Sequence, residues 1–164
     1  MRYVIALGSN RRHGRHGAPA AVLRAALGEL GGVLAVSAIR ATSALGPAGR
    51  GFANAAAIVE SDLDPEAMLT RLKEIERAFG RRGGRRWGPR VLDLDIILWS
   101  EGPWGGPGPI VPHSAFRERR FVLDPLAEIA PEWRDPISGL TVRQLLARLT
   151  RPRPARRAAT AKGP

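Results

Sequence analysis

Two aspartates, Asp93 and Asp95, lie within the apolar segment VLDLDIILW at residues 91–99. Alternate residues of a β-strand share a face, so both carboxylates should project from one side with Cα atoms roughly 6.5–7 Å apart. Acidic residues are depleted in strands, and two on one face repel each other unless cations compensate them. Carboxylate oxygens suit Mg²⁺, which usually takes one or two of them together with substrate phosphates. The pair therefore predicts a metal site.

An arginine-rich segment precedes this strand, with six arginines and no acidic residue between Arg77 and Arg90. Taken alone, the two aspartates could simply form a solvent-facing side of a sheet, paired with these arginines. Guanidinium groups that face two carboxylates are better explained if a metal-bound polyphosphate lies between them. The sequence contains no G-x-x-x-x-G-K-[ST] motif, which excludes a P-loop. The residues by themselves indicate metal-dependent phosphoryl or nucleotidyl transfer.

The elements that must position these groups can be read from the apolar periodicity. We expect strands over residues 3–7, 33–39, 52–61 and 91–99, and helices over residues 19–30, 64–79, 121–129 and 142–149. The second helix has the clearest ends, because Asp64 is a good N-cap, Pro65 suits the first turn and Gly80 suits the terminus. In the last strand, the core face is expected to consist of Leu92, Leu94, Ile96 and Leu98. The order of the first six elements predicts an α+β fold with a ferredoxin-like antiparallel sheet flanked by helices.

Composition narrows the class of protein. The chain has 164 residues and a net charge of +11, from 26 basic and 15 acidic side chains. It contains no cysteine, so disulfides, thiol catalysis and cysteine zinc sites are excluded. No apolar run approaches the roughly 20 residues that a membrane span requires. We expect a cytoplasmic protein with one domain over residues 1–149 and a basic, disordered tail over residues 150–164.

The segment RWGPRVLDLDII at residues 86–97 resembles the signature of the 6-hydroxymethyl-7,8-dihydropterin pyrophosphokinase family of folate biosynthesis. Other segments resemble the same family in order, namely ALGSN (6–10), FANAA (52–56), VPH (111–113) and PLAEIAP (125–131). The resemblance implies a ferredoxin-like fold and transfer of the β,γ-diphosphate of MgATP to the hydroxymethyl group of the dihydropterin, with release of AMP. It also implies small-molecule partners only, with no membrane or specific nucleic acid, and a monomer.

The resemblance further assigns roles to individual residues. The catalytic residues would be Arg81, Arg90, Asp93 and Asp95, with both aspartates holding two Mg²⁺ ions. The ATP-binding residues would be Lys73, Glu76, Arg82, Arg86, Arg90, Ile96, His113, Ser114 and Arg119. The pterin-binding residues would be Thr42, Ser43, Leu45, Phe52, Asn54, Trp87, Asp93 and Phe121, with the pterin between the rings of Phe52 and Phe121. Independently of the family, Phe52 and Asn54 would share a strand face and could offer a ring and an amide to one flat heterocycle.

Two alternative functions stay open at this point. A nucleic-acid-binding module could use the basic tail and the arginines of residues 77–90. It would leave Asp93 and Asp95 unexplained, because without metal they repel phosphate. A different two-metal nucleotidyltransferase would use the same aspartates but would release pyrophosphate.

Overall fold

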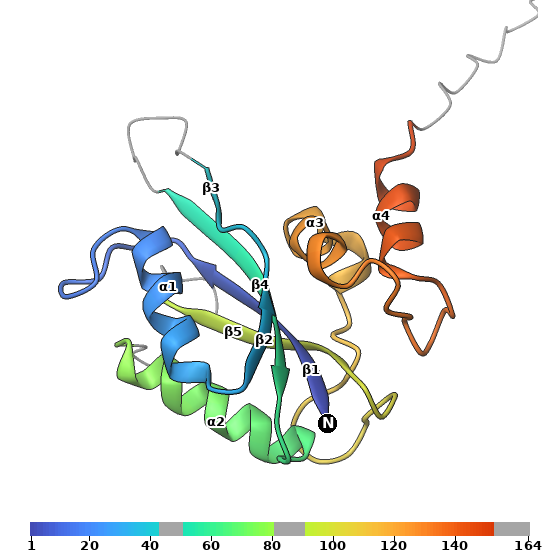
Figure 1. The fold of residues 1–164 in the computed structure, drawn as a ribbon, viewed down its shortest axis with the longest axis horizontal. Coiled ribbons are helices and arrows are strands. Elements are labelled where there is room, and N and C mark those ends of the chain that lie inside the picture. The colour runs from blue at the N-terminus through green and yellow to red at the C-terminus, as the bar shows by residue number, and fades with distance from the viewer. Residues whose placement is uncertain (43–50, 81–90, 153–164) are drawn as a thin grey trace, which may run out of the picture.

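The computed structural model describes residues 1–42, 51–80 and 91–152. Five strands and four α-helices form this part of the chain, together with a short 3₁₀ helix at Phe116–Glu118 (Figure 1). Their bounds are β1 Arg2–Ser9, α1 Pro19–Leu30, β2 Val33–Val36, β3 Arg40–Thr42, β4 Phe52–Glu60, α2 Pro65–Ala78, β5 Asp93–Trp99, α3 Arg120–Ile129 and α4 Val142–Thr150. Among these described residues, no helix is long and apolar enough to cross a membrane.

The strands form one antiparallel sheet in the order β2-β4-β1-β5, and β3 pairs with the beginning of β4. The central strand β1 lies between the strand that begins at Phe52 and the strand that carries both aspartates. If β2 and β3 are counted as one interrupted strand, the chain has the order β-α-β-β-α-β. With the antiparallel sheet, this confirms the predicted ferredoxin-like α+β fold.

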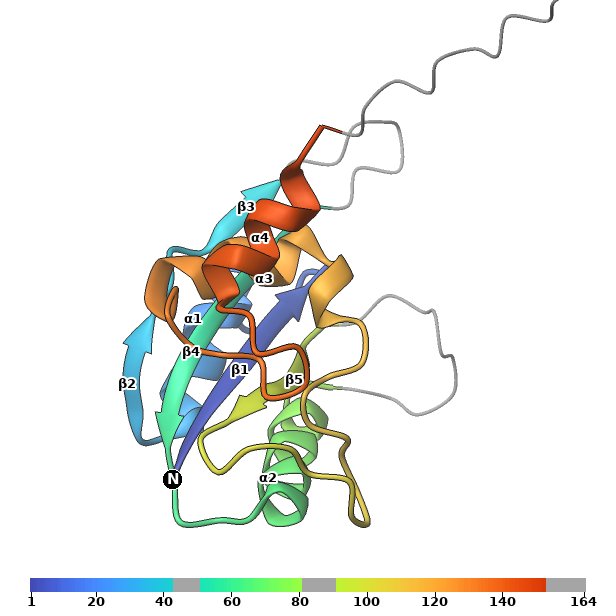
Figure 2. The same cartoon turned by 90° about the vertical axis from the view of Figure 1, so that its right-hand side faces the viewer.

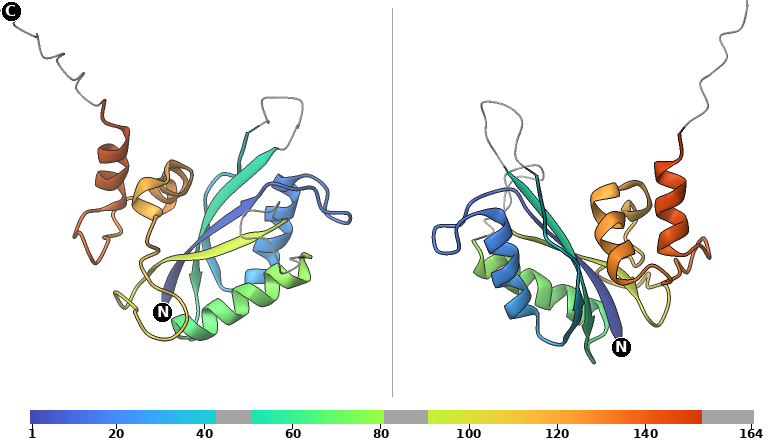
Figure 3. Two further views of the ribbon diagram at one scale, coloured as in Figure 1. Left: turned by 180° about the vertical axis from the view of Figure 1, so that it is seen from behind. Right: turned by 45° about the horizontal axis from the view of Figure 1, so that its top comes forward.

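Helices cover both faces of the sheet, with α1 and α2 on one side and α3 and α4 on the other (Figures 2 and 3). The first core contains Ile5 and Leu7 of β1 with Leu23 of α1 and Leu72 of α2. The second core joins Val4 of β1 to the buried side chains of α3 and α4. Odd- and even-numbered residues of β1 thus serve different cores, as the two-residue period of a strand requires.

The start of α2 forms as its sequence predicts. The side chain of Asp64 accepts a hydrogen bond of 2.8 Å from the backbone N–H of Ala67, and Pro65 occupies the first turn. This cap satisfies one of the donors that a helix N-terminus leaves without a partner. The helix then packs Met68, Leu72 and Ile75 against the sheet, which fixes the layer behind β5.

The predicted core face of β5 is wrong at its end. Leu98 does not continue the face of Leu94 and Ile96; it packs with Ile97 in the core on the opposite side of the sheet. The cause is an irregularity in the pairing with β1, where the register shifts between Val4 and Ile5 and leaves Ile97 as an extra residue. Such a bulge places two consecutive side chains on one side of a sheet and reverses the alternation beyond it.

The strand expected over residues 33–39 ends early, at Val36, and a separate short strand, β3, begins beyond it at Arg40. Ser37 lies at the break between β2 and β3, where its backbone N–H donates to Ala56 O and its hydroxyl accepts from Ala56 N, both at 2.9 Å. The hydroxyl thus replaces a backbone acceptor of the ladder, and the chain leaves the sheet at Ala38 before it returns as β3. Apolar periodicity does not predict this substitution.

Candidate active site

Three adjacent strands form the floor of a pocket on the α3 side of the sheet. In the ladder, Gly8 of β1 lies opposite both Asn54 of β4 and Asp93 of β5, and Ala6 lies opposite Asp95. The small side chains of the central strand leave space between the amide on one neighbour and the carboxylates on the other. The pocket is lined in the described residues by Ala6, Leu7, Gly8, Asn54, Ala55, Asp93, Asp95, Ile97, His113, Arg119, Phe121 and Val122.

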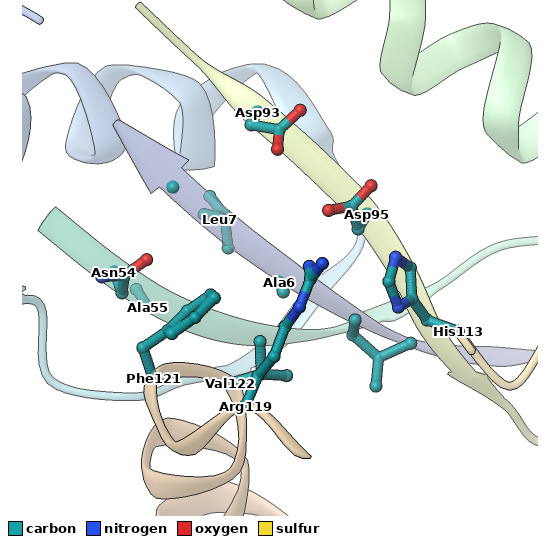
Figure 4. Close-up of a pocket in the computed structure, with 12 residues that line it drawn as sticks. Ala6, Leu7, Asn54, Ala55, Asp93, Asp95, His113, Arg119, Phe121 and Val122 are labelled. Atoms are coloured by element: carbon teal, nitrogen blue, oxygen red, sulfur yellow. The ribbon is translucent and has the colours of Figure 1, made fainter. Parts of the chain in front are cut away.

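The walls of this pocket come from the chain beyond β5. Arg119 and Phe121 lie at the beginning of α3, and Figure 4 shows the Arg119 side chain reaching over β1 towards Asp95. The Phe121 ring lies near Asn54 in the same view and is 52% exposed, as expected of a ring that offers a face to a ligand. The Arg119 guanidinium lies 5.8 Å from the centre of that ring, a cation–π distance.

His113 lies in the segment that follows β5 and lines the same pocket as the aspartates. Its backbone N–H donates to Ile97 O at 3.1 Å, which attaches the segment to the strand beside the aspartates. Its Nδ1 atom accepts from the backbone N–H of Ala115 at 3.2 Å. That contact leaves Nε2 as the ring nitrogen available to donate to a ligand.

The two carboxylates do not compensate each other. Burial and, secondarily, the charge of Asp93 raise the pKa of Asp95 above its ordinary value, while His113, Lys73 and Arg119 act in the opposite direction. Desolvation and a like charge both disfavour an ionised carboxyl group. The arrangement therefore favours a bound cation at this point of the pocket.

Behind the aspartates, α2 holds the outer edge of β5. The Glu76 carboxylate is fully buried and accepts a 2.8 Å hydrogen bond from the backbone N–H of Leu94, the residue between the aspartates. The Lys73 ammonium lies 3.0 Å from both oxygens of the same carboxylate. Glu76 thus satisfies a backbone donor on a strand at the edge of the sheet and fixes the backbone from which Asp93 and Asp95 project.

The structure brings together six of the residues predicted for the site: Asn54, Asp93, Asp95, His113, Arg119 and Phe121. Five other predicted residues with described side chains are absent from the described lining: Phe52, Lys73, Glu76, Ile96 and Ser114. Lys73 and Glu76 lie behind the aspartates on α2. Phe52 lies on β4 two residues before Asn54 and is the cross-strand partner of Thr42 on β3, which is described by this backbone pairing. Ser114 is exposed, and the Ile96 side chain packs in the core on the α2 side. The remaining predicted residues lie outside the described ranges, namely Ser43, Leu45, Arg81, Arg82, Arg86, Trp87 and Arg90.

Sequence reasoning missed several lining residues. Ala6 and Gly8 form the floor, and Ile97 and Val122 contribute apolar surface. A signal for the floor was present, because small residues alternate with large ones at the end of β1. The sequence contained no such signal for Ile97 and Val122, because an apolar residue in a strand or helix is most simply interpreted as part of the core.

Comparisons with known proteins identify the family of the chain. The family model of 7,8-dihydro-6-hydroxymethylpterin-pyrophosphokinase (HPPK) matches residues 4–131. The chain is 39% identical over 129 residues to the 2-amino-4-hydroxy-6-hydroxymethyldihydropteridine pyrophosphokinase of Synechocystis sp., covering 76% of this chain and 66% of that protein. It is 40% identical over 148 residues to the protein of the same name from Pseudomonas aeruginosa, covering 90% of this chain and 91% of that one.

A further relative of that name, from Methylorubrum extorquens, is 45% identical over 98 residues, which cover 60% of this chain and 61% of the relative. The matches to the Synechocystis and Methylorubrum proteins thus span less than two thirds of those proteins' lengths.

Solved structures show the same fold. Wild-type Plasmodium falciparum HPPK-DHPS superposes with a TM-score of 0.66 at 14% identity, covering 90% of this chain and 40% of that one. A structure of HPPK-DHPS in complex with substrates gives a TM-score of 0.68 at 12% identity, covering 90% and 43%. With a family match over most of its length, the chain belongs to the 7,8-dihydro-6-hydroxymethylpterin-pyrophosphokinase family.

Proposed function

We propose that this protein transfers the β,γ-diphosphate of MgATP to the hydroxymethyl group of 6-hydroxymethyl-7,8-dihydropterin and releases AMP. The observation that carries the proposal is the pair Asp93 and Asp95 on one face of β5, facing Arg119 and His113 across one pocket. Family membership supports the reaction type, because the relatives are named as pyrophosphokinases of this pterin.

The pair of carboxylates fits divalent magnesium. Both side chains supply hard oxygen ligands, and the raised pKa of Asp95 reflects a negative site that a cation would relieve. Within the described residues, no cluster of three or more histidine, cysteine or acidic side chains forms a metal site. Asp93 and Asp95 would therefore hold Mg²⁺ together with phosphate oxygens and water, which is the usual arrangement for this ion. When bound, Mg²⁺ would neutralise the charge that develops on the transferring phosphates.

The chain's own residues would hold the two substrates on opposite sides of the aspartates. Arg119, with its fixed fork of donors, and the Nε2–H of His113 are suited to phosphate oxygens. Phe121 offers a ring for stacking and Asn54 an amide that can both donate and accept, which suits the edge of a pterin. The pocket thus has a charged side and an aromatic side that meet at Asp93 and Asp95.

The proposed transfer is a displacement at the β-phosphorus. The hydroxymethyl oxygen forms a bond to that phosphorus, the bond from it to the oxygen bridging the α-phosphorus breaks, and AMP leaves with this oxygen. The hydroxyl proton passes to water, since such transfers depend on positioning and charge stabilisation rather than on a strong base. Arg119 and His113 would orient the triphosphate, while Phe121 and Asn54 would orient the attacking hydroxymethyl group.

One assay tests the proposal and separates it from its rivals. The protein is incubated with ATP, Mg²⁺ and 6-hydroxymethyl-7,8-dihydropterin, and nucleotide products are separated by chromatography. Pterin-dependent formation of AMP without free pyrophosphate supports the proposal. Release of pyrophosphate would indicate a nucleotidyltransferase, and the absence of any pterin-dependent reaction would refute the proposed substrate. We extend the proposal to a monomer in the cytoplasm, to be measured by sedimentation velocity and cell fractionation.

A further inference from the structure

A single acidic side chain, Glu128, joins α3 to the segment between β2 and β3. Its Oε1 atom accepts a 2.8 Å hydrogen bond from the backbone N–H of Ala38, and its Oε2 atom lies 3.3 Å from the guanidinium of Arg40. One carboxylate thus contacts the chain on both sides of Ile39. This connection, which we call the Glu128 clamp, consists of Glu128, Ala38 and Arg40.

The clamp depends on the break in the strand at Ser37. Because the Ser37 hydroxyl takes the place of a ladder acceptor for Ala56, the chain departs from β4 at this residue. The next backbone donor, the N–H of Ala38, then points to α3 and is satisfied by Glu128. Hydrogen bonds between a backbone N–H and a carboxylate are charge-assisted and stronger than neutral ones. The break therefore creates an anchor point for α3 immediately before β3.

The clamp and the pocket lie at two ends of the same helix face. Glu128 follows Phe121 by seven residues, which is nearly two full turns, so both side chains project from one side of α3. On the sheet, Arg40 of the clamp is the cross-strand partner of Asn54, which lines the pocket. The clamp thus ties the helix that carries Phe121 to the strand pair that carries Asn54.

From this geometry we propose that Glu128 is a positioning residue that sets the gap between the Phe121 ring and the Asn54 amide, and thereby the affinity for the flat pterin. The inference rests on the proposed function for the identity of the ligand. ATP would bind on the other side of Asp93 and Asp95, next to Arg119 and His113. A shift of α3 would move Phe121 and Arg119 together, but His113 and the aspartates lie on other elements and would keep their places. Glu128 should therefore affect the pterin more than ATP.

The attachment of α3 itself does not depend on the clamp. Val122, Leu123 and Leu126 are at most 5% exposed and hold the helix on the sheet by apolar burial. The ion pair to Arg40 is exposed on both sides and adds little by itself. Loss of the clamp should consequently change the tilt of α3 over β3 and β4 without unfolding the helix.

The test compares Glu128→Ala, which removes both contacts, with Glu128→Gln, which keeps an acceptor for the Ala38 N–H. Loss of a charge-assisted hydrogen bond predicts that Glu128→Ala raises the KM for the pterin about tenfold. The KM for ATP should rise clearly less than the KM for the pterin, and the melting temperature should stay near wild type. Glu128→Gln should stay within about twofold for both substrates. The matched control is Glu132→Ala, which removes another exposed pair, between Glu132 and Arg143, away from the pocket.

The outcomes separate this inference from the proposed function. If the wild-type protein forms no AMP, the proposed function fails, and the dissociation constant of the pterin measured by calorimetry still decides the role of Glu128. If Glu128→Ala leaves pterin affinity unchanged, or weakens pterin and ATP equally, the positioning role is refuted. A pterin defect as large in Glu132→Ala as in Glu128→Ala would also refute it, because it would then reflect general loss of surface charge.

Discussion

Asp135 and Asp95 are both carboxylates within the fold, and the protein treats them in opposite ways. Asp135 is completely buried; its oxygens receive two hydrogen bonds from Arg117, at 2.6 and 2.7 Å, and others from Ser138 and the Ile137 N–H. Burial acts to raise the pKa of Asp135, but these hydrogen bonds outweigh it and lower the pKa to about 2. Asp95 instead has a raised pKa, caused by burial and by its neighbour Asp93.

The difference indicates what each carboxylate is for. A buried charge that the protein satisfies by itself contributes to the structure and leaves no capacity for a ligand. A carboxylate held beside a like charge at a pocket costs stability, and groups with perturbed pKa values are concentrated at functional sites. Asp135 therefore organises the turn before α4, and Asp95 is kept in an unfavourable state that a bound cation would relieve.

Replacing Asp95 by asparagine gives the largest expected effect. The variant keeps the shape of the side chain but loses the charge, so AMP formation should fall on the order of a thousandfold, or about 4 kcal/mol of barrier. The free energy of unfolding should stay equal or rise, because a destabilising charge has been removed. Steady-state assays and urea denaturation measure the two quantities. Activity near wild type would mean that Asp95 is not a metal ligand.

Replacing Asp135 by asparagine should lower stability and leave activity unchanged, the reverse of the effects expected for Asp95→Asn. Arg117 would lose its buried partner, which predicts a loss of about 3 kcal/mol in the free energy of unfolding. The turnover of the folded fraction should stay near wild type, since neither residue lines the described part of the pocket. Urea denaturation and activity at low temperature test this. A variant as stable as wild type would contradict the structural role of the pair.

Lowering the pH should remove the contribution of Asp135 to the free energy of unfolding without any substitution at Asp135 itself. The pKa of Asp135 is depressed from its ordinary value of 3.8 to about 2 in the folded protein. Its contribution of about 2 kcal/mol is therefore fully present above about pH 4 and is lost as the pH falls through about 2. The stability gap between wild type and Asp135→Asn, measured by urea denaturation, should narrow over this window. A constant gap from pH 5 to pH 2 would refute the assignment.

The sequence predicted the parts of the molecule that depend on local pattern. The capped helix α2, the strand of Asp93 and Asp95 and their shared face all follow from residue periods and caps. The sequence did not predict which side of the sheet Leu98 faces, because the bulge at Ile97 is set by the register with β1. The break at Ser37 likewise depends on a hydroxyl that enters the ladder of a neighbouring strand. Neither the bulge nor the break changes the apolar pattern of the segment in which it occurs.

The site shows the same division. His113 and Arg119 were assigned by resemblance alone, because a histidine or arginine in a loop has no period that reveals its direction. The pair of Arg117 and Asp135 was missed, because the two residues are 18 positions apart, with the whole of α3 between them, and meet only in the folded state. Burial and pKa direction, which distinguish Asp135 from Asp95, are properties of packing and have no signal in the sequence.

The smallest expected effect is the stabilisation of the folded protein by Mg²⁺, which should depend on Asp95 and not on Asp135. At a free Mg²⁺ concentration about five times its dissociation constant, binding to the folded state adds about 1 kcal/mol to the free energy of unfolding. Wild type should gain this amount, and Asp135→Asn should gain the same increment on its lower baseline. Asp95→Asn should gain much less, because half of the carboxylate pair is missing. Thermal denaturation with Mg²⁺, and with Na⁺ at matched ionic strength, measures the increments; equal gains in all three proteins would place the cation elsewhere.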